Sequence, residues 1–251
     1  MRYKRKKNYW QQDIHKLEYL KAILSGGIII SLASYMFYGT WWCTILLSPY
    51  LIRYIKSWEK QYIKKKQQTF RMQFKETIQS LAAGLNVGYS VENALREATK
   101  ELKEIYKKDD VILRELHYMI RQLQMNQTAE QVLGEFASRT GEEDVQTFVT
   151  VFGMAKRSGG DTMEIIRNAV RQIGEKIDVE REIETVLAAK KLELKILSII
   201  PFAMILYLRI SFPEFLQVLY GNVGGAVVMS ICLLVYWISY EAGRKIVEIE
   251  V

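Results

Sequence analysis

Cysteine and histidine are scarce in this chain of 251 residues, which has two of each. Cys43 and Cys232 each lie inside an apolar run, so we expect neither a disulfide framework nor a thiolate metal site. His15 and His117 are isolated in sequence, without a second ligand at metal-binding spacing. We therefore predict no metal site and interpret both histidines as solvated or packed side chains.

The sequence motifs of nucleotide binding and hydrolysis are also missing. There is no GxxxxGK[ST] phosphate loop, no HExxH zinc motif and no GxSxG nucleophile turn. Gly159 and Gly160 precede an expected helix start, where backbone N–H groups can hold an anion, but a helix restart explains the same residues. We predict no catalytic, cofactor-binding or metal-binding residue, no cofactor, and a protein that is not an enzyme.

Charge is unevenly distributed along the chain. The net charge is +7, and the excess of Lys and Arg is concentrated in residues 1–21 and 53–75, on either side of an uncharged run. This pattern is typical of charge at a membrane edge, so a phospholipid membrane is the expected partner rather than a nucleic acid. Residues 1–21 lack the small-residue cleavage site of a removed signal peptide. We expect them to remain as a basic cytoplasmic tail.

Residues 22–52 contain no charged side chain. One helix of this length would extend about 46 Å, longer than a hydrocarbon core of about 30 Å. A single tilted span is one interpretation. A hairpin that turns near Gly39 is the favoured one, because both flanking segments are basic and cytoplasmic loops carry the Lys/Arg excess.

Two further apolar segments lie in residues 196–240, and residues 241–251 form a second tail with cytoplasmic character. Arg209 follows the first of these segments. It is interpreted as a snorkelling side chain or, alternatively, as a polar contact to a neighbouring helix. The expected topology has about four transmembrane helices, two N-terminal and two C-terminal. Both termini are expected in the cytoplasm.

Between the apolar ends, residues 53–69 read as a basic linker and residues 70–195 as a helical domain. Apolar residues recur at helical spacing in six segments, which short connections separate, and no alternating strand pattern appears. Thr128 and Gln131 predict a capping box for the fourth helix, which should end near Gly141. We predict an all-α membrane protein with one cytoplasmic six-helix bundle.

The same helix–glycine–cap–helix pattern occurs twice in this domain. Gly84, Gly88 and Ser90 are expected to end one helix and start the next. Gly159, Gly160 and Asp161 are expected to do the same further along the chain. The helix after the second turn has no proline until Pro201, so it is expected to continue from the cytosolic domain into the membrane as a mechanical lever.

Several of these segments resemble the type II secretion system F-domain superfamily. The resemblance lies in "LAAGLNVGYSVENAL" at residues 81–95, "AKRSGGDTMEIIRNAV" at 155–170, and "LAAKKLELKILSIIP" at 187–201 as the chain enters a membrane span. A single domain copy and the ending "RKIVEIEV" make the chain most similar to the TadB-type platform proteins of Tad pili, or to their TadC-type paralogues. Relatives in type II secretion and type IV pili usually carry two copies.

The resemblance implies a non-enzymatic inner-membrane platform. Such proteins are thought to contact a hexameric assembly ATPase, a paralogous platform protein and pilins, within a homo- or hetero-oligomer, and to couple the ATPase to pilin extraction. For the ATPase contact we expect a role for Lys64, Lys65 and Lys66 in the basic linker and for Arg157 beside the second turn.

Two other classes of function remain open from the sequence. One is a membrane-bound sensor or enzyme that uses the helical cytosolic domain, which would need a polar pocket. The other is a subunit of a transporter or channel, which would need polar residues that face inward at mid-membrane. The apolar segments offer only Ser, Thr and Cys for that role.

Overall fold

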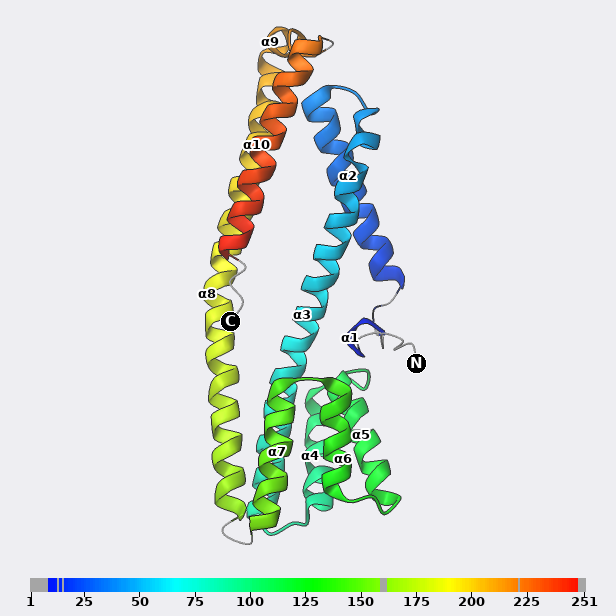
Figure 1. Ribbon diagram of the computed structural model, residues 1–251, viewed down its shortest axis with the longest axis vertical. Coiled ribbons are helices and arrows are strands. Elements are labelled where there is room, and N and C mark those ends of the chain that lie inside the picture. Colours follow the sequence, from blue (N-terminus) through cyan, green and yellow to red (C-terminus); the bar gives the residue numbers. More distant parts are fainter. Residues whose placement is uncertain (1–8, 13, 15, 159–161, 221, 248–251) are drawn as a thin grey trace, which may run out of the picture. The chain divides into compact units, whose positions relative to one another are not determined.

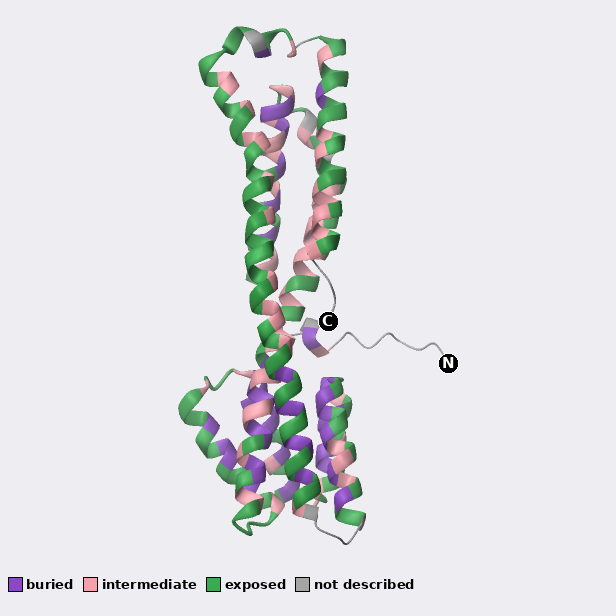
Figure 2. Cartoon of the chain, turned by 90° about the vertical axis from the view of Figure 1, so that its left-hand side faces the viewer, coloured by how far each residue is buried: buried purple, intermediate pink, exposed green. Residues whose placement is uncertain are grey.

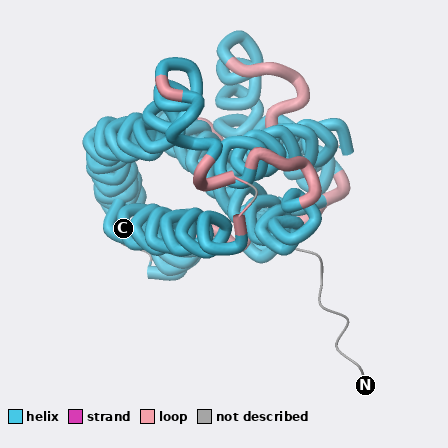
Figure 3. Tube along the Cα trace, turned by 90° about the horizontal axis from the view of Figure 1, so that it is seen from above, coloured by secondary structure: helices cyan, strands magenta, loops and turns pink. Residues whose placement is uncertain are grey.

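All the secondary structure is helical in the computed structural model, which describes residues 9–12, 14, 16–158, 162–220 and 222–247 (Figures 1 and 3). For this part of the chain the prediction of an all-α fold is confirmed. In chain order the helices are α1 (Tyr9–Gln12), α2 (Lys16–Tyr38), α3 (Cys43–Asn86), α4 (Val91–Ile105), α5 (Val111–Gln124), α6 (Ala129–Thr140), α7 (Glu143–Ser158), α8 (Thr162–Ser211), α9 (Pro213–Gln217) and α10 (Val223–Val247).

Internal contacts divide the chain into two units. The core unit comprises residues 1–13 and 62–179, and the membrane unit comprises residues 14–61 and 180–251. Helices α3 and α8 each supply residues to both units. Buried side chains are concentrated in the core unit, where they form its hydrophobic core (purple in Figure 2).

The helices of the core unit are amphipathic and have defined ends. In α4 the buried residues Ala94, Leu95, Ala98 and Leu102 recur every three or four positions, which places them on one face. Helix α6 begins at a capping box, in which the Thr128 hydroxyl accepts from the Gln131 N–H and the Gln131 side chain accepts from the Thr128 N–H. The helix ends at Gly141, whose φ of +65° is the left-handed conformation that glycine tolerates best.

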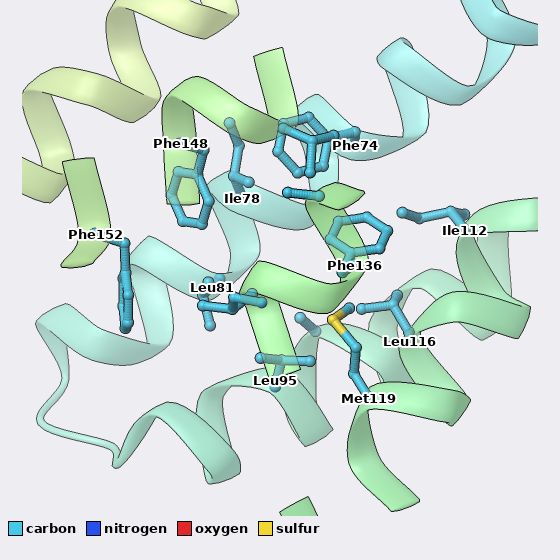
Figure 4. Close-up of a cluster of buried hydrophobic side chains, with 14 of the residues drawn as sticks. Phe74, Ile78, Leu81, Leu95, Ile112, Leu116, Met119, Phe136, Phe148 and Phe152 are labelled. Atoms are coloured by element: carbon cyan, nitrogen blue, oxygen red, sulfur yellow. The ribbon is translucent and has the colours of Figure 1, made fainter. Parts of the chain in front are cut away.

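Phenylalanines from three helices, α3, α6 and α7, meet in the core of this unit (Figure 4). The Phe74 ring lies 6.2 Å from that of Phe136 and 6.0 Å from that of Phe148, edge-on to the latter. Phe70 stacks beside Phe74 at 6.4 Å. Burial of a large apolar side chain contributes about 1.5–3 kcal/mol relative to exposure, so this cluster is a main source of the unit's stability. Around it lie Ile78, Leu81, Leu95, Ile112, Leu116, Met119 and Phe152.

The membrane unit has a different distribution of apolar residues. Among the described residues, α2, α8 and α10 contain windows that are long and apolar enough to cross a membrane. Most of the large apolar side chains in these windows are exposed, since they do not pack into a protein core. Apolar side chains that remain exposed on such helices are suited to contact with lipid. The chain is therefore a membrane protein.

Helices α2 and α3 form an antiparallel hairpin within the membrane unit. The chain turns at Gly39, where φ is +66°, as the hairpin interpretation requires. The Tyr19 hydroxyl donates to Glu59 at 2.9 Å, 40 residues away. A Cβ on Gly26 would lie 2.8 Å from the Tyr54 ring, so a glycine is required for this close packing. The predicted second arm, residues 41–52, lies at the start of α3.

Helices α8 and α10 pack together at the other apolar end of the chain. The Tyr236 hydroxyl donates to the main-chain oxygen of Ser198 at 3.1 Å, and the Tyr236 ring lies edge-on to Phe202 at 5.4 Å. Arg209 of α8 donates to the main-chain oxygen of Tyr35 in α2 at 3.2 Å, and its guanidinium lies 4.1 Å from the Tyr35 ring centroid. Of the two interpretations of Arg209, the structure has the polar contact to a neighbouring helix.

Candidate functional site

The first glycine turn connects α3 to α4. Gly88 adopts φ +92°, which a Cβ disfavours, so glycine is required for the chain to reverse here. Gly84 does not lie in the turn itself, in contrast to the sequence expectation, but inside α3. A Cβ there would lie 3.0 Å from the Ala94 Cβ, so this glycine allows α3 and α4 to approach closely. Ser90 lies directly before α4, and its hydroxyl accepts from the Asn93 N–H at 3.4 Å.

The second turn lies between α7 and α8. Gly159, Gly160 and Asp161 fall outside the described residues, so their predicted roles stay predictions. Arg157, in the last turn of α7, is exposed, and its Nε donates to the main-chain oxygen of Gly153 at 3.0 Å.

A hydrogen bond brings the start of α8 beside the end of α3. Arg167 donates to the Asn86 side chain at 2.9 Å, 81 residues away in sequence. Because α7 ends only four residues before α8 begins, Arg157 lies at this same end of the core unit (Figure 1). The first glycine turn and the residues around the second turn therefore belong to one end of the unit.

The basic residues Lys64, Lys65 and Lys66 lie in α3, where Lys64 and Lys65 are exposed and Lys66 is half-buried. Twenty residues of continuous helix separate Lys66 from Asn86, a length of about 30 Å. The structure therefore does not bring the basic residues together with Arg157. A partner that contacts both would have to extend along α3.

Ion pairs connect α8 to its neighbours in the core unit. Lys75 of α3 contacts Asp178 of α8 at 2.6 Å, and Lys176 of α8 contacts the buried carboxylate of Asp144 in α7 at 2.8 Å. The Asp178 side chain is about half exposed, so solvent weakens the first pair to about 1 kcal/mol or less. The Asp144 pair is better shielded and defines where α8 lies against α7.

Tyr106, directly after α4, is a further polar link to α3. Its hydroxyl donates to Glu76 at 2.6 Å. Burial, and then the hydrogen bond to the Glu76 carboxylate, raise the pKa of Tyr106 above its usual value of 10. The neutral hydroxyl is therefore the form that the folded core unit favours.

The sequence analysis missed the contact of the N-terminal residues with the core unit. Trp10 is 5% exposed and packs on Phe70, and Tyr9 donates to Glu115 at 2.7 Å. The available signal was the aromatic pair itself, which stands out beside a run of lysines and arginines. Its partners lie 60 to 130 residues away, so no local pattern could identify them.

A pocket or a metal-binding cluster in the described part of the chain would indicate a site for a ligand. An open depression at the α5–α6 turn is lined by Gln127, Gln131, Gly134, Glu135 and Ser138, of which only Glu135 is ionisable. Within the same residues, no three His, Cys, Asp or Glu side chains are grouped so that they could hold a metal ion.

The chain matches a known family over most of its length. Residues 50–208, more than half of the chain, match the family model described as type II secretion system (T2SS), protein F. The matched range covers α3 from Tyr50, all of α4 to α7, and α8 as far as Leu208, so it includes parts of both units. No curated protein and no solved structure was found to match the chain.

Proposed function

Since the chain belongs to the type II secretion system protein F family, we propose that it is an inner-membrane platform protein of a pilus or secretion machine. Proteins of this family are structural platform components rather than enzymes. The family match over residues 50–208 is the observation that carries the proposal. We propose further that the chain couples a hexameric cytoplasmic ATPase to the extraction of pilins from the membrane.

Within this proposal the chain crosses the membrane four times. The spans are α2, residues 41–52 with the start of α3 at Cys43, the apolar part of α8, and α10. Basic residues at both ends of the α2–α3 hairpin support this topology, because cytoplasmic loops carry the Lys/Arg excess. Both termini and the core unit then lie in the cytoplasm, where an ATPase can reach them.

The two long helices supply a route for motion from the core unit to the membrane. Helix α3 is continuous over 44 residues and α8 over 50 residues, and each belongs partly to the core unit and partly to the membrane unit. A helix transmits displacement better than a flexible loop, because each turn is held by backbone hydrogen bonds. Movement of the core unit would therefore be passed to the bilayer through α3 and α8.

The proposed ATPase contact includes the exposed residues Lys64 and Lys65 and, at the other end of the core unit, Arg157. Lysines at such a position can attract an acidic surface and increase the rate of association. We propose a TadB-like or TadC-like role, in which the chain works with a paralogous platform protein.

Co-purification from membranes tests this function. The tagged protein, extracted in mild detergent, should retain an assembly ATPase or the paralogous platform protein. The double variant Lys64→Glu/Lys65→Glu should insert normally but recover several-fold less ATPase, with Lys100→Glu and Lys103→Glu on α4 as a charge-matched control. Recovery of neither partner with the unmodified protein would contradict the proposal, and equal ATPase recovery with both double variants would remove the lysines from the contact.

A further inference from the structure

The N-terminal residues supply a side chain to the hydrophobic core of the core unit. Trp10 of α1 is 5% exposed and lies edge-on to Phe70 of α3, with ring centroids 5.1 Å apart. Its indole N–H donates to the main-chain oxygen of Thr140 at 3.1 Å. Thr140 is the last residue of α6, where a carbonyl has no partner within its own helix. The indole therefore packs on the Phe70 ring and also donates a hydrogen bond to the free carbonyl at the end of α6.

Tyr9 makes a second contact, to a buried charge. Its hydroxyl donates to one carboxylate oxygen of Glu115 at 2.7 Å. The other oxygen accepts from Arg139 at 2.8 and 3.1 Å, and the Arg139 guanidinium lies 4.4 Å from the Tyr118 ring centroid. Glu115 is 7% exposed, and a carboxylate buried to this extent requires such partners. Tyr9 completes the hydrogen bonding of Glu115.

Helix α1 thus contacts residues of α3, α5 and α6 that lie 60 to 130 positions further along the chain. An aromatic pair in a basic tail beside a membrane could instead insert among lipid headgroups, where Trp and Tyr are common. In this structure Tyr9 and Trp10 contact protein instead. Trp10 makes one ring contact and one indole hydrogen bond, and Tyr9 makes one phenol hydrogen bond.

The covalent chain connects this contact to the first membrane helix. Only residues 13–15 separate Gln12 from Lys16, the first residue of α2. Four residue steps can span roughly 14 Å at most. While Trp10 is seated, the start of α2 cannot move farther than this from the end of α1.

We propose that α1 is a tether which makes α2 a third helix driven by the core unit, in addition to α3 and α8. Tyr9 and Trp10 are its attachment points. Its seat consists of Phe70, Glu115 and Thr140, which they contact, and of Arg139, which holds the other oxygen of Glu115. That the core unit drives α2 rests on the proposed platform function. That Tyr9 and Trp10 bind to the seat does not rest on it. Release of the tether would leave α2 covalently connected to the core unit only through the α2–α3 turn and α3.

The seat is tested by hydrogen exchange on the intact protein in lipid nanodiscs. Trp10→Ala should increase exchange at the end of α6, residues 137–142, roughly tenfold or more, because the burial of the indole is lost. Trp10→Phe should give a smaller increase, since it keeps an aromatic ring beside Phe70 and loses the N–H donor and only part of the buried apolar surface. Trp42→Ala, at an exposed tryptophan of the membrane unit, is the matched control and should leave this exchange unchanged. Unchanged exchange in Trp10→Ala would overturn the seat and favour a headgroup location for α1.

The mechanical role is tested in cells with Trp10→Ala and with a further variant, Tyr9→Phe, which loses the hydroxyl that donates to Glu115. Trp10→Ala and Tyr9→Phe should reduce pilus assembly or secretion several-fold while the ATPase is still recovered with the protein. Assembly at the unmodified level, together with increased exchange, would overturn the tether role and leave the platform function intact. If the unmodified protein recovers neither the assembly ATPase nor the paralogous platform protein, the platform function is contradicted. That result does not affect the contacts of Tyr9 and Trp10 with the core unit.

Discussion

Replacement of Gly84 by alanine tests the close approach of α3 and α4 most sharply. Alanine is the better helix former by about 1 kcal/mol, so at an open helical position this change should stabilise the protein. At Gly84 the new Cβ would lie 3.0 Å from the Ala94 Cβ and 3.2 Å from its Cα, and α4 must move to admit it. Overpacking of this kind costs about 1–3 kcal/mol. The expected net effect is destabilisation by about 0–2 kcal/mol.

Gly134 of α6 supplies the matched control, because a Cβ there would meet nothing within 4 Å. Gly134→Ala should stabilise the core unit by about 0.5–1 kcal/mol. The difference between the two variants isolates the steric contribution of Ala94. Ala94→Gly should relieve it, so the double variant Gly84→Ala/Ala94→Gly should show a favourable coupling of about 1–2 kcal/mol.

Hydrogen exchange in the detergent-solubilised protein measures the free energy of opening of the core unit, and it can be applied to all four variants. The thermal unfolding midpoint gives a second measure. If Gly84→Ala stabilised the unit as much as Gly134→Ala, the close approach of α3 and α4 would be refuted. A coupling of zero in the double variant would refute the identification of Ala94 as the obstructing residue.

Two further predictions concern single polar side chains. The raised pKa of Tyr106 means that its contribution to stability is complete below about pH 10 and is lost as the pH rises through the higher folded value. Above about pH 10, the stability of the unmodified protein should therefore fall more steeply with pH than that of Tyr106→Phe. Identical slopes of stability against pH for the two proteins would contradict the link to Glu76. Arg209→Lys keeps the charge but loses the planar contact to Tyr35, so it should lower the unfolding midpoint nearly as much as Arg209→Ala, by the equivalent of about 0.5–2 kcal/mol. An unaffected lysine variant would favour simple snorkelling.

Features set by short sequence spacing were predictable in this chain. The capping box of Thr128 and Gln131 and the end of α6 at Gly141 depend on contacts within four residues, and the structure has both. The all-helical character followed from apolar periodicity in the same way. The continuity of α8 past residue 195 followed from the absence of helix-breaking residues before Pro201.

Features set by contacts between distant segments were not predictable. Gly84 looked like a turn residue because it stands near Gly88, and only the position of α4 reveals that it is needed for close packing. Trp10 looked like part of a basic tail. The residues that it contacts lie 60 to 130 positions away, so no local pattern could indicate them. Arg209 offered two interpretations until the α2 carbonyl beside it was known. In each case the deciding partner belongs to another helix.

The platform function is tested most directly by cross-linking in intact membranes. A photoreactive amino acid at Lys65, which is exposed on α3, would be activated in cells that assemble the machine, and the cross-linked proteins identified. The proposed function predicts a cross-link to a cytoplasmic assembly ATPase that depends on the presence of that ATPase. The absence of any ATPase cross-link while assembly proceeds, or labelling of position 65 from the outer face of the membrane, would contradict it.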